Sequence, residues 1–339
     1  STPCTPTQLT PGPTTNANGI DSSAAAYLTF YHLPNSATTL NNGDLGIYTF
    51  PAQQVVNENF FTTRIDHKIS EKDAIFGTYL FDKTPYSSPD GLNNVLFDTK
   101  TARQIFAVEE THTFGQRLEN ALRFGYNHEA VNNNESLKAI NPDAARSDLG
   151  VGGTDFAGRD ASQIIISGVT SFTGGVGGSP TYFYHWNSFQ LYDDAYLSRG
   201  AHSIKFGGAI EPMSLNVLAD TDPNGIWKFG GLQQFFTNNP SKFQGGIAHT
   251  LSPRNLRSKI FGLYLQDDWR FRPNLTLNLG LRYEFVTVPT EVNGKISNLR
   301  NVTDSKLTIG SPWHSNPALK NFGPRVGFAW DPFGTAKTS

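Results

Sequence analysis

The most regular pattern in the chain is the strict alternation of apolar and polar residues over positions 275–285. The sequence there reads LTLNLGLRYEF, so every second side chain is apolar and the side chains between them are Thr, Asn, Gly, Arg and Glu. Side chains of a β-strand point alternately to its two faces. The stretch is therefore predicted to be a strand with one apolar face and one polar face, which separates two different environments.

Four pairs of alternating segments flank short polar turns, which predicts four β-hairpins. The turns read SEKD, GQR, SRGA and RPN and begin at residues 70, 115, 198 and 272. The predicted hairpins join 59–69 to 74–83, 103–114 to 118–129, 183–197 to 202–212, and 258–271 to 275–287. Two further strands, at 163–170 and 322–331, bring the expected total to about ten.

The connections between hairpins are long, in contrast to the turns within them. Polar spans rich in Gly, Asn or Pro cover about 84–102, 130–160, 213–257 and 288–320. Residues 1–58 are rich in Pro, Thr, Asn, Ser and Gly, which predicts an extracellular loop region with one short helix around residues 21–32. We therefore expect a loop region at 1–58 and a β-barrel region at 59–339 whose two ends differ.

The length of the predicted strands indicates a membrane. Several run for about ten to twelve residues, whereas strands of soluble proteins usually have about five or six. A transmembrane strand needs about nine to eleven tilted residues. Arg282 and Glu284 on the polar parity suit a wet lumen, and Trp269 and Phe271 near a strand end suit an interfacial girdle. The prediction is an all-β, antiparallel, up-and-down transmembrane β-barrel, with lipid outside and water inside.

One acidic residue does not fit this pattern. Asp267 has the same parity as the apolar residues Leu263, Leu265 and Trp269, so a regular strand would turn its carboxylate toward lipid. A charged group in hydrocarbon is costly unless it lies near the interface. We therefore predict a β-bulge at Asp267 and Asp268 that changes the direction of both side chains.

Composition narrows the class of protein. The 339 residues carry 27 basic and 29 acidic side chains, a net charge of -2, which disfavours nucleic acid as a partner. Charged residues are only 17% and aromatic residues reach 12%, a balance that favours β structure. No run approaches the roughly 18 apolar residues of a spanning helix. The single cysteine, Cys4, has no second cysteine in the chain with which to form a disulfide.

Three segments resemble the barrel of TonB-dependent outer-membrane receptors, and in particular the Oar-like group. They read YLQDDWRFRPNLTLNLGLRYEF at 264–285, NFGPRVGFAWDPFG at 321–334 and RIDHKISEKDAIFGTYLF at 64–81. The resemblance covers about residues 59–334 and implies a large barrel with an N-terminal plug, in the outer membrane of a Gram-negative-type bacterium. It also implies import of a bulky, scarce ligand, driven by the inner-membrane TonB complex, without chemistry. About ten strands cannot close such a barrel, so an internal barrel fragment is expected.

The ligand-binding candidates are three aromatic residues in the long span 213–257: Trp227, Phe229 and Phe235. Exposed aromatic rings stack on sugars or anchor bulky ligands. The same rings would also explain a loop that packs its own hydrophobic cluster. Both interpretations stay open on sequence grounds.

The other motifs give weaker signals. Asp220, Asp222 and Asn224 match the first half of a calcium loop, but Gly231 stands where a bidentate Glu belongs, which favours a plain turn. Glu110 and His112 share a strand face and are expected to touch as a polar pair rather than as a zinc site. The glycine run at 174–178 lacks the Lys of a phosphate loop. We therefore predict no catalytic residue, no resident metal and no cofactor.

Two other classes of protein also fit the pattern. A soluble all-β carbohydrate-binding module or hydrolase would use the aromatic loops around 213–257, and a surface adhesion protein would use the long loops. A need for detergent distinguishes the membrane protein from the soluble one.

Overall fold

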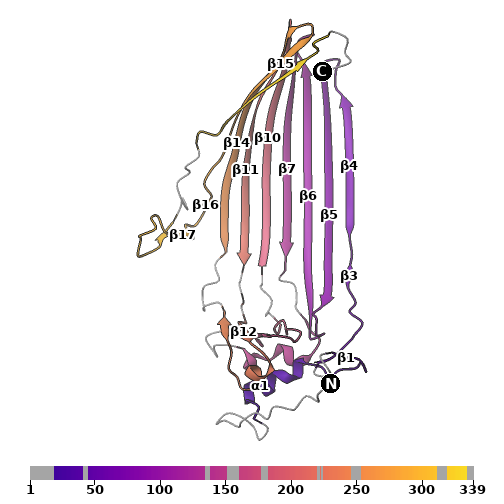
Figure 1. The fold of residues 1–339 in the computed structure, drawn as a ribbon. Helices are drawn as coiled ribbons and strands as arrows, with labels where there is room; N and C mark the ends of the chain where they lie inside the picture. The colour runs from indigo at the N-terminus through magenta and orange to yellow at the C-terminus, as the bar shows by residue number, and fades with distance from the viewer. Residues whose placement is uncertain are drawn as a thin grey trace.

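The structure is a tall, single-layered β-sheet with a small globular cap of loops at one end (Figure 1). It is a computed structural model that describes residues 19–40, 45–133, 138–150, 160–176, 182–219, 222, 224–245, 253–310 and 319–333. Within these ranges, no helix is long and apolar enough to cross a membrane. The sheet is therefore the main element of the described chain.

Nine long antiparallel strands form the sheet. Long strands that follow one another along the chain lie side by side in the sheet. They are β4 (Asn59–Lys68), β5 (Asp73–Pro89), β6 (Val95–Thr113), β7 (Leu118–Asn132), β10 (Tyr182–Arg199), β11 (His202–Ala219), β14 (Arg254–Arg272), β15 (Leu275–Val286) and β19 (Phe322–Trp330). A short strand, β3 (Val55–Val56), also pairs with β5. No ladder joins β4 to β19 in the described part of the chain, so these strands form the two edges.

All four predicted hairpins are present, with their tight turns together at the end away from the cap. The strands extend farther toward the cap than predicted. The expected long loop at 84–102 is wrong, because β5 and β6 remain paired from Asp73 opposite His112 to Pro89 opposite Leu96. A strand of 19 residues spans about 60 Å, whereas a strand tilted by about 45° needs only about 35 Å to cross an apolar band of about 25 Å. Outside that band apolar alternation has no physical cause, so the pattern could not reveal these extensions.

The cap combines short elements from four separate parts of the chain. The first comprises α1 (Ser22–Tyr27) and η1 (Leu28–Phe30), which confirm the predicted short helix. The others contribute β8 (Lys138–Ala139), η3 (Pro142–Ala145), η4 (Ser147–Leu149), β9 (Gln163–Ile166), β12 (Ile226–Phe229), α2 (Leu232–Phe236) and β13 (Lys242–Gln244). Strand β9 pairs in parallel with β12 and not with the large sheet. The strand predicted at 163–170 thus exists but belongs to the cap.

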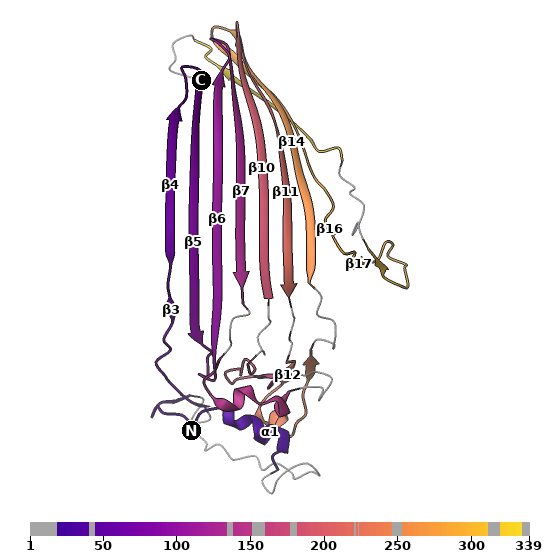
Figure 2. The same ribbon diagram turned by 180° about the vertical axis from the view of Figure 1, so that it is seen from behind.

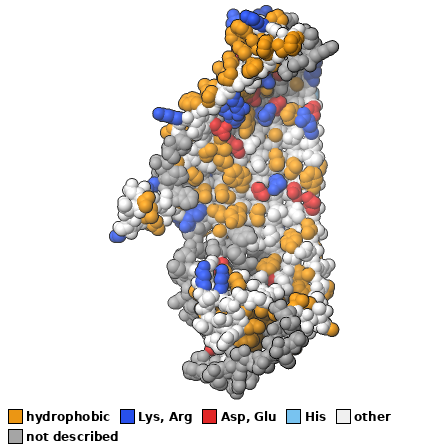
Figure 3. All heavy atoms as spheres, in the orientation of Figure 1, with side chains coloured by type: hydrophobic (Ala, Val, Ile, Leu, Met, Phe, Trp, Pro, Cys, Tyr) orange, Lys and Arg blue, Asp and Glu red, His pale blue; other side chains and the backbone are white. Residues whose placement is uncertain are grey.

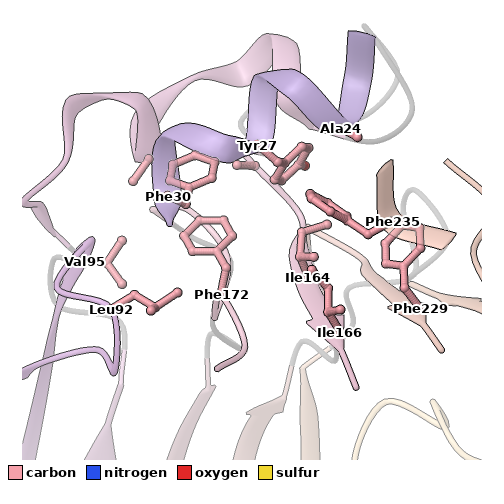
Figure 4. Packing of buried hydrophobic residues seen from close by; sticks show 12 residues of the cluster. Ala24, Tyr27, Phe30, Leu92, Val95, Ile164, Ile166, Phe172, Phe229 and Phe235 are labelled. Atoms are coloured by element: carbon pink, nitrogen blue, oxygen red, sulfur yellow. The ribbon is translucent and has the colours of Figure 1, made fainter. Parts of the chain in front are cut away.

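Aromatic and aliphatic side chains form the core of the cap (Figure 4). The rings of Phe30 and Phe172 stack at 3.9 Å and both are fully buried. The hydroxyl of Tyr27 donates to the carbonyl oxygen of Leu149 at 2.8 Å and accepts from the backbone N–H of Ser162 at 2.8 Å. This core fixes the N-terminal helix against loops that lie more than 100 residues away in sequence.

Smaller elements lie at the margins. They are β1 (Thr39–Leu40) with β2 (Leu45–Gly46), β16 (Thr290–Glu291), and β17 (Ser297–Asn298) with β18 (Thr308–Ile309). The segment that contains β17 projects from the side of the sheet near β14, as both views show (Figures 1 and 2).

Candidate functional site

The register of the ladders assigns every side chain of the sheet to one of two faces, because directly opposed residues share a face. One face, here called the apolar face, carries the odd-numbered residues of β15 and their partners across the sheet. In mid-sheet it consists mainly of Val108, Phe124, Leu191, Ile210, Phe261, Leu263, Leu281 and Val326. Many of these remain exposed, among them Leu263 at 62%. An exposed apolar surface of this extent indicates a non-aqueous neighbour.

Aromatic residues mark both margins of the apolar face. Tyr79, Phe106, Tyr126 and Phe189 stand opposite one another in successive strands on the cap side. Trp269, at the turn side, packs against His202 and Phe271. Girdles of this kind flank the hydrocarbon band of membrane barrels. The positions of the aromatic residues therefore agree with the predicted lipid contact.

The opposite face, here called the polar face, carries charges of both signs. Arg123 lies 2.5 Å from Glu109, and the hydroxyl of Tyr264 donates to Asp194 at 2.7 Å. Basic and acidic side chains are interspersed with hydrophobic ones on the face that Figure 3 presents. Most of these charges are exposed and have partners nearby. Such a surface requires water.

One glycine on the polar face is needed for this arrangement. A Cβ at Gly207 would lie 2.8 Å from Cε1 of Tyr264 and 2.5 Å from an oxygen of Asp194. The absence of a side chain lets the Tyr264 ring lie over β11 and reach the Asp194 carboxylate. The glycine thus sets the position of one polar pair.

The predicted bulge at Asp267 and Asp268 is wrong. Asp267 stands opposite Ile204 and Leu279, and Asp268 opposite Ser203 and Asn278, in regular ladders. The irregularity of β14 lies instead between Arg270 and Arg272. Asp267 therefore does belong to the apolar face.

The environment of Asp267 explains why a carboxylate is tolerated there. Its Oδ2 lies 2.7 Å from Nδ1 of His202, and that imidazole stacks on Trp269 at the margin of the face. A charge near the interface costs far less than one in the middle of the hydrocarbon. The polar partner and the marginal position replace the expected bulge.

Glu110 and His112 share the apolar face as predicted, and the structure adds a third residue. Asp73 stands opposite His112 across the β5–β6 ladder, and the imidazole Nδ1 lies 2.5 Å from its Oδ1. Sequence spacing could not reveal Asp73, because it lies on another strand.

By contrast, His128 lies on the apolar face and Glu129 on the polar face, where Glu129 pairs with Arg103 at 3.2 Å.

The three predicted ligand-binding aromatics lie together in the cap. Trp227, Phe229 and Phe235 line one cavity of about 270 Å³ with Tyr27 and Asp148. Phe229 and Phe235 are buried in the cap core and meet edge to face at 5.4 Å. Trp227 is only partly buried and packs against Phe243 at 4.3 Å between ring centres. The rings thus serve packing, and they also form the wall of a cavity.

Charged and hydroxyl groups complete this cavity. The guanidinium of Arg146 hydrogen-bonds Asp148 at 2.7 Å and lowers the pKa of that carboxyl, so Asp148 supplies a fixed negative charge. Burial raises the pKa of the Tyr27 hydroxyl. In the adjacent core, burial raises the pKa of Tyr31 to about 12. The lining combines aromatic surface with a carboxylate, which suits binding of a ligand with apolar and polar parts.

The weak calcium candidate stays a prediction, and only two of its three residues lie in the described part of the chain. Asp220 lies outside the described residues, and Asp222 accepts a hydrogen bond from Gln244 at 2.7 Å. Asn224 is buried, and its backbone carbonyl accepts from Ser162 at 2.6 Å. These contacts hold the turn before β12 in place. Of the glycine run, residues 177–178 also lie outside the described residues.

The whole sequence, residues 1–339, matches the family described as "Outer membrane beta barrel domain". The chain belongs to this family. This match confirms the outer-membrane barrel fold and the location in the outer membrane of a Gram-negative-type bacterium. Both were predicted from the alternation and the resemblance. The apolar face has the character of the outer wall of such a barrel, and the polar face has the character of its interior. Membership decides against the soluble module and the soluble hydrolase.

Two solved structures are similar to this barrel domain. One, titled "Copper transporter OprC", shares 8% identity with a TM-score of 0.39, over 83% of this chain and 34% of its own. The other is BauA, the ferric preacinetobactin receptor from Acinetobacter baumannii, with 13% identity and a TM-score of 0.40, over 81% and 37%. This chain spans about a third of the length of these proteins. No curated protein matches its sequence.

Proposed function

We propose that this barrel domain is part of an outer-membrane receptor that binds a bulky, scarce ligand and imports it, without chemistry of its own. The observation that carries the proposal is the two-sided wall. Its apolar face suits lipid, and its polar face presents paired charges such as Arg123 with Glu109 to an aqueous interior. The resemblance of three strand segments to TonB-dependent receptors supports the same function.

The cap is the proposed place where the ligand first binds. In outer-membrane barrels the short turns are periplasmic and the long loops extracellular, which would put the cap outside the cell. Residues 19–31 pack into it, which supports an extracellular position for the region 1–58. Trp227 is the proposed ligand contact, because its ring is only partly buried at the cavity, and Asp148 supplies a polar anchor.

We further propose that the inner-membrane TonB complex drives import in the full-length protein. The support is the resemblance of residues 64–81, 264–285 and 321–334 to the barrels of receptors that work in this way. The wall described here would hold the aqueous path, and membrane lipid would surround it.

The binding step is testable by titration of the full-length protein in detergent micelles with two probes, a ferric hydroxamate siderophore and maltohexaose. Tryptophan fluorescence reports binding, and Trp227→Ala is compared with Trp330→Ala, a residue on the apolar face of β19. We expect saturable binding of one probe. Trp227→Ala should lower the affinity at least about tenfold, which corresponds to roughly 1.4 kcal/mol of binding free energy, and Trp330→Ala should leave the affinity unchanged. Equal affinities of both variants would refute the cap cavity as the binding site.

The transport step needs cells. A strain that lacks the gene should take up the bound probe more slowly than the parent strain, and dissipation of the proton gradient should slow the parent to the same rate. Uptake that is equal in both strains would refute the function as an importer.

A further inference from the structure

Three side chains with metal-binding atoms meet on the apolar face, at the end of the sheet that holds the tight turns. This turn-end cluster consists of Asp73, Glu110 and His112. One ligand atom from each lies within 4.8 Å of the others. Asp73 is the first residue of β5 and stands opposite His112, while Glu110 lies two residues earlier on β6 and therefore on the same face. The β5–β6 ladder itself brings the cluster together.

The ligand set suits a borderline divalent ion of the zinc class. One imidazole nitrogen and two carboxylate oxygens are common zinc ligands, with bonds of about 2.0–2.2 Å, and water takes the remaining position in open sites. Two ligand atoms on one tetrahedral ion lie about 3.4 Å apart. The direct contact of 2.5 Å between His112 and Asp73 would therefore open as the ion enters between these side chains and Glu110. Two carboxylates beside one histidine also leave an excess of negative charge that a divalent cation would neutralise.

Neighbouring groups orient two of the three ligands. The hydroxyl of Ser70, in the turn before β5, donates to Oδ2 of Asp73 and leaves Oδ1 directed at His112. The ring of Phe114 packs edge-on against the imidazole of His112 at 4.2 Å. Outer contacts of this kind fix the orientation of metal ligands and strengthen binding.

The cluster lies at the margin of the apolar face. The side chains of His112 and Asp73 are 31% and 30% exposed, and they lie directly beside the turn at residues 69–72. An ion could reach them without crossing the hydrocarbon band.

The same face contains a natural comparison. His202 and Asp267 form a second pair at 2.7 Å, also beside an aromatic ring, that of Trp269. Among the described residues, no third histidine, cysteine or acidic side chain joins them within metal-binding reach. The two sites differ mainly in the third ligand, Glu110.

We propose that the turn-end cluster is a zinc-class metal site that clamps β5 to β6 at the periplasmic margin of the barrel wall. Asp73, Glu110 and His112 provide three ligands and water provides the rest. The site is independent of the ligand cavity in the cap, so either proposal can fail without the other.

The test uses full-length protein, stripped of metal in detergent micelles and titrated with zinc chloride against a chromophoric chelator. Variants H112A and E110Q are compared with wild type, and H202A is the control. We expect one zinc equivalent whose affinity falls by about 10- to 100-fold in H112A and E110Q and stays unchanged in H202A. Cobalt(II) should give a visible absorption band that H112A loses.

Folding of each variant is checked by its heat-modifiable migration on gels. If H112A does not fold, E110Q decides the test, because it retains the shape and the hydrogen-bonding reach of the side chain. Zinc affinity that is equal in wild type and E110Q, or a loss in H202A as large as in H112A, would overturn the metal site.

Discussion

An arginine placed at Leu263 should destabilise the inserted barrel wall, whereas one at Gln266 on the same strand should not. Leu263 lies on the apolar face and is 62% exposed. Its opposed partners are Gly208 and Tyr283, and neither offers a carboxylate. Asp193 lies on the same face one strand beyond Gly208, where it already accepts a hydrogen bond from Asn120. Gln266 lies on the polar face, 3.3 Å from Asp268, so an arginine there gains an acidic neighbour. The two substitutions add the same charge to opposite sides of one strand.

The depth of each position sets the magnitude. Leu263 lies six residues from Trp269 at the turn-side girdle, which corresponds to about 14 Å of height for a strand tilted by about 45°. This is near the middle of a hydrocarbon band about 25 Å tall, where an arginine costs about 2–4 kcal/mol. Leu279 stands opposite Asp267, which lies only about 5 Å above the girdle by the same geometry. L279R should therefore cost less, about 0–1 kcal/mol.

The assay is reversible unfolding of the full-length protein in phospholipid vesicles by guanidinium chloride, monitored by tryptophan fluorescence and heat-modifiable migration. The expected order of stability is Q266R, then L279R, then L263R. Equal stability of Q266R and L263R would refute the assignment of the two faces. A lower stability of L279R than of L263R would refute the position given to the lipid band.

Three further predictions concern the cap and its surroundings. F172A should destabilise the cap by about 3–5 kcal/mol, because it removes one fully buried ring of the stack with Phe30, and hydrogen exchange at residues 160–176 should rise while β5 to β7 stay protected. Burial raises the pKa of Tyr31 to about 12. The stability that this residue contributes, about 2–3 kcal/mol, is present below pH 10 and is lost as the pH rises through 12, so the guanidinium midpoint for unfolding of the cap should fall over this range in wild type and much less in Y31F. E291Q should destabilise the loop beside β14 by about 1–3 kcal/mol, because Glu291 accepts backbone hydrogen bonds from Asn255, Asn293 and Lys295, and proteolysis near 290–298 should report the loss.

Local sequence determined the wall. Alternation at period two encodes which side of a strand faces lipid, and a turn of three or four residues brings adjacent strands into register. Both signals lie within neighbouring residues, so the four hairpins and the position of Leu263 and Leu281 on one apolar face could be predicted without coordinates. The family match over the whole chain agrees with that prediction.

Only the tertiary structure decided the contents of the cap and the composition of the side-chain clusters. Tyr27 meets Ser162 across 135 residues and Thr29 meets Asp143 across 114, and no local pattern encodes such contacts. Asp73 joins His112 through the β5–β6 register, and Asp267 stays on the apolar face because His202 lies beside it. Alternation specifies the direction in which a side chain points, but its neighbours there depend on how distant strands and loops pack, which is a property of the whole fold.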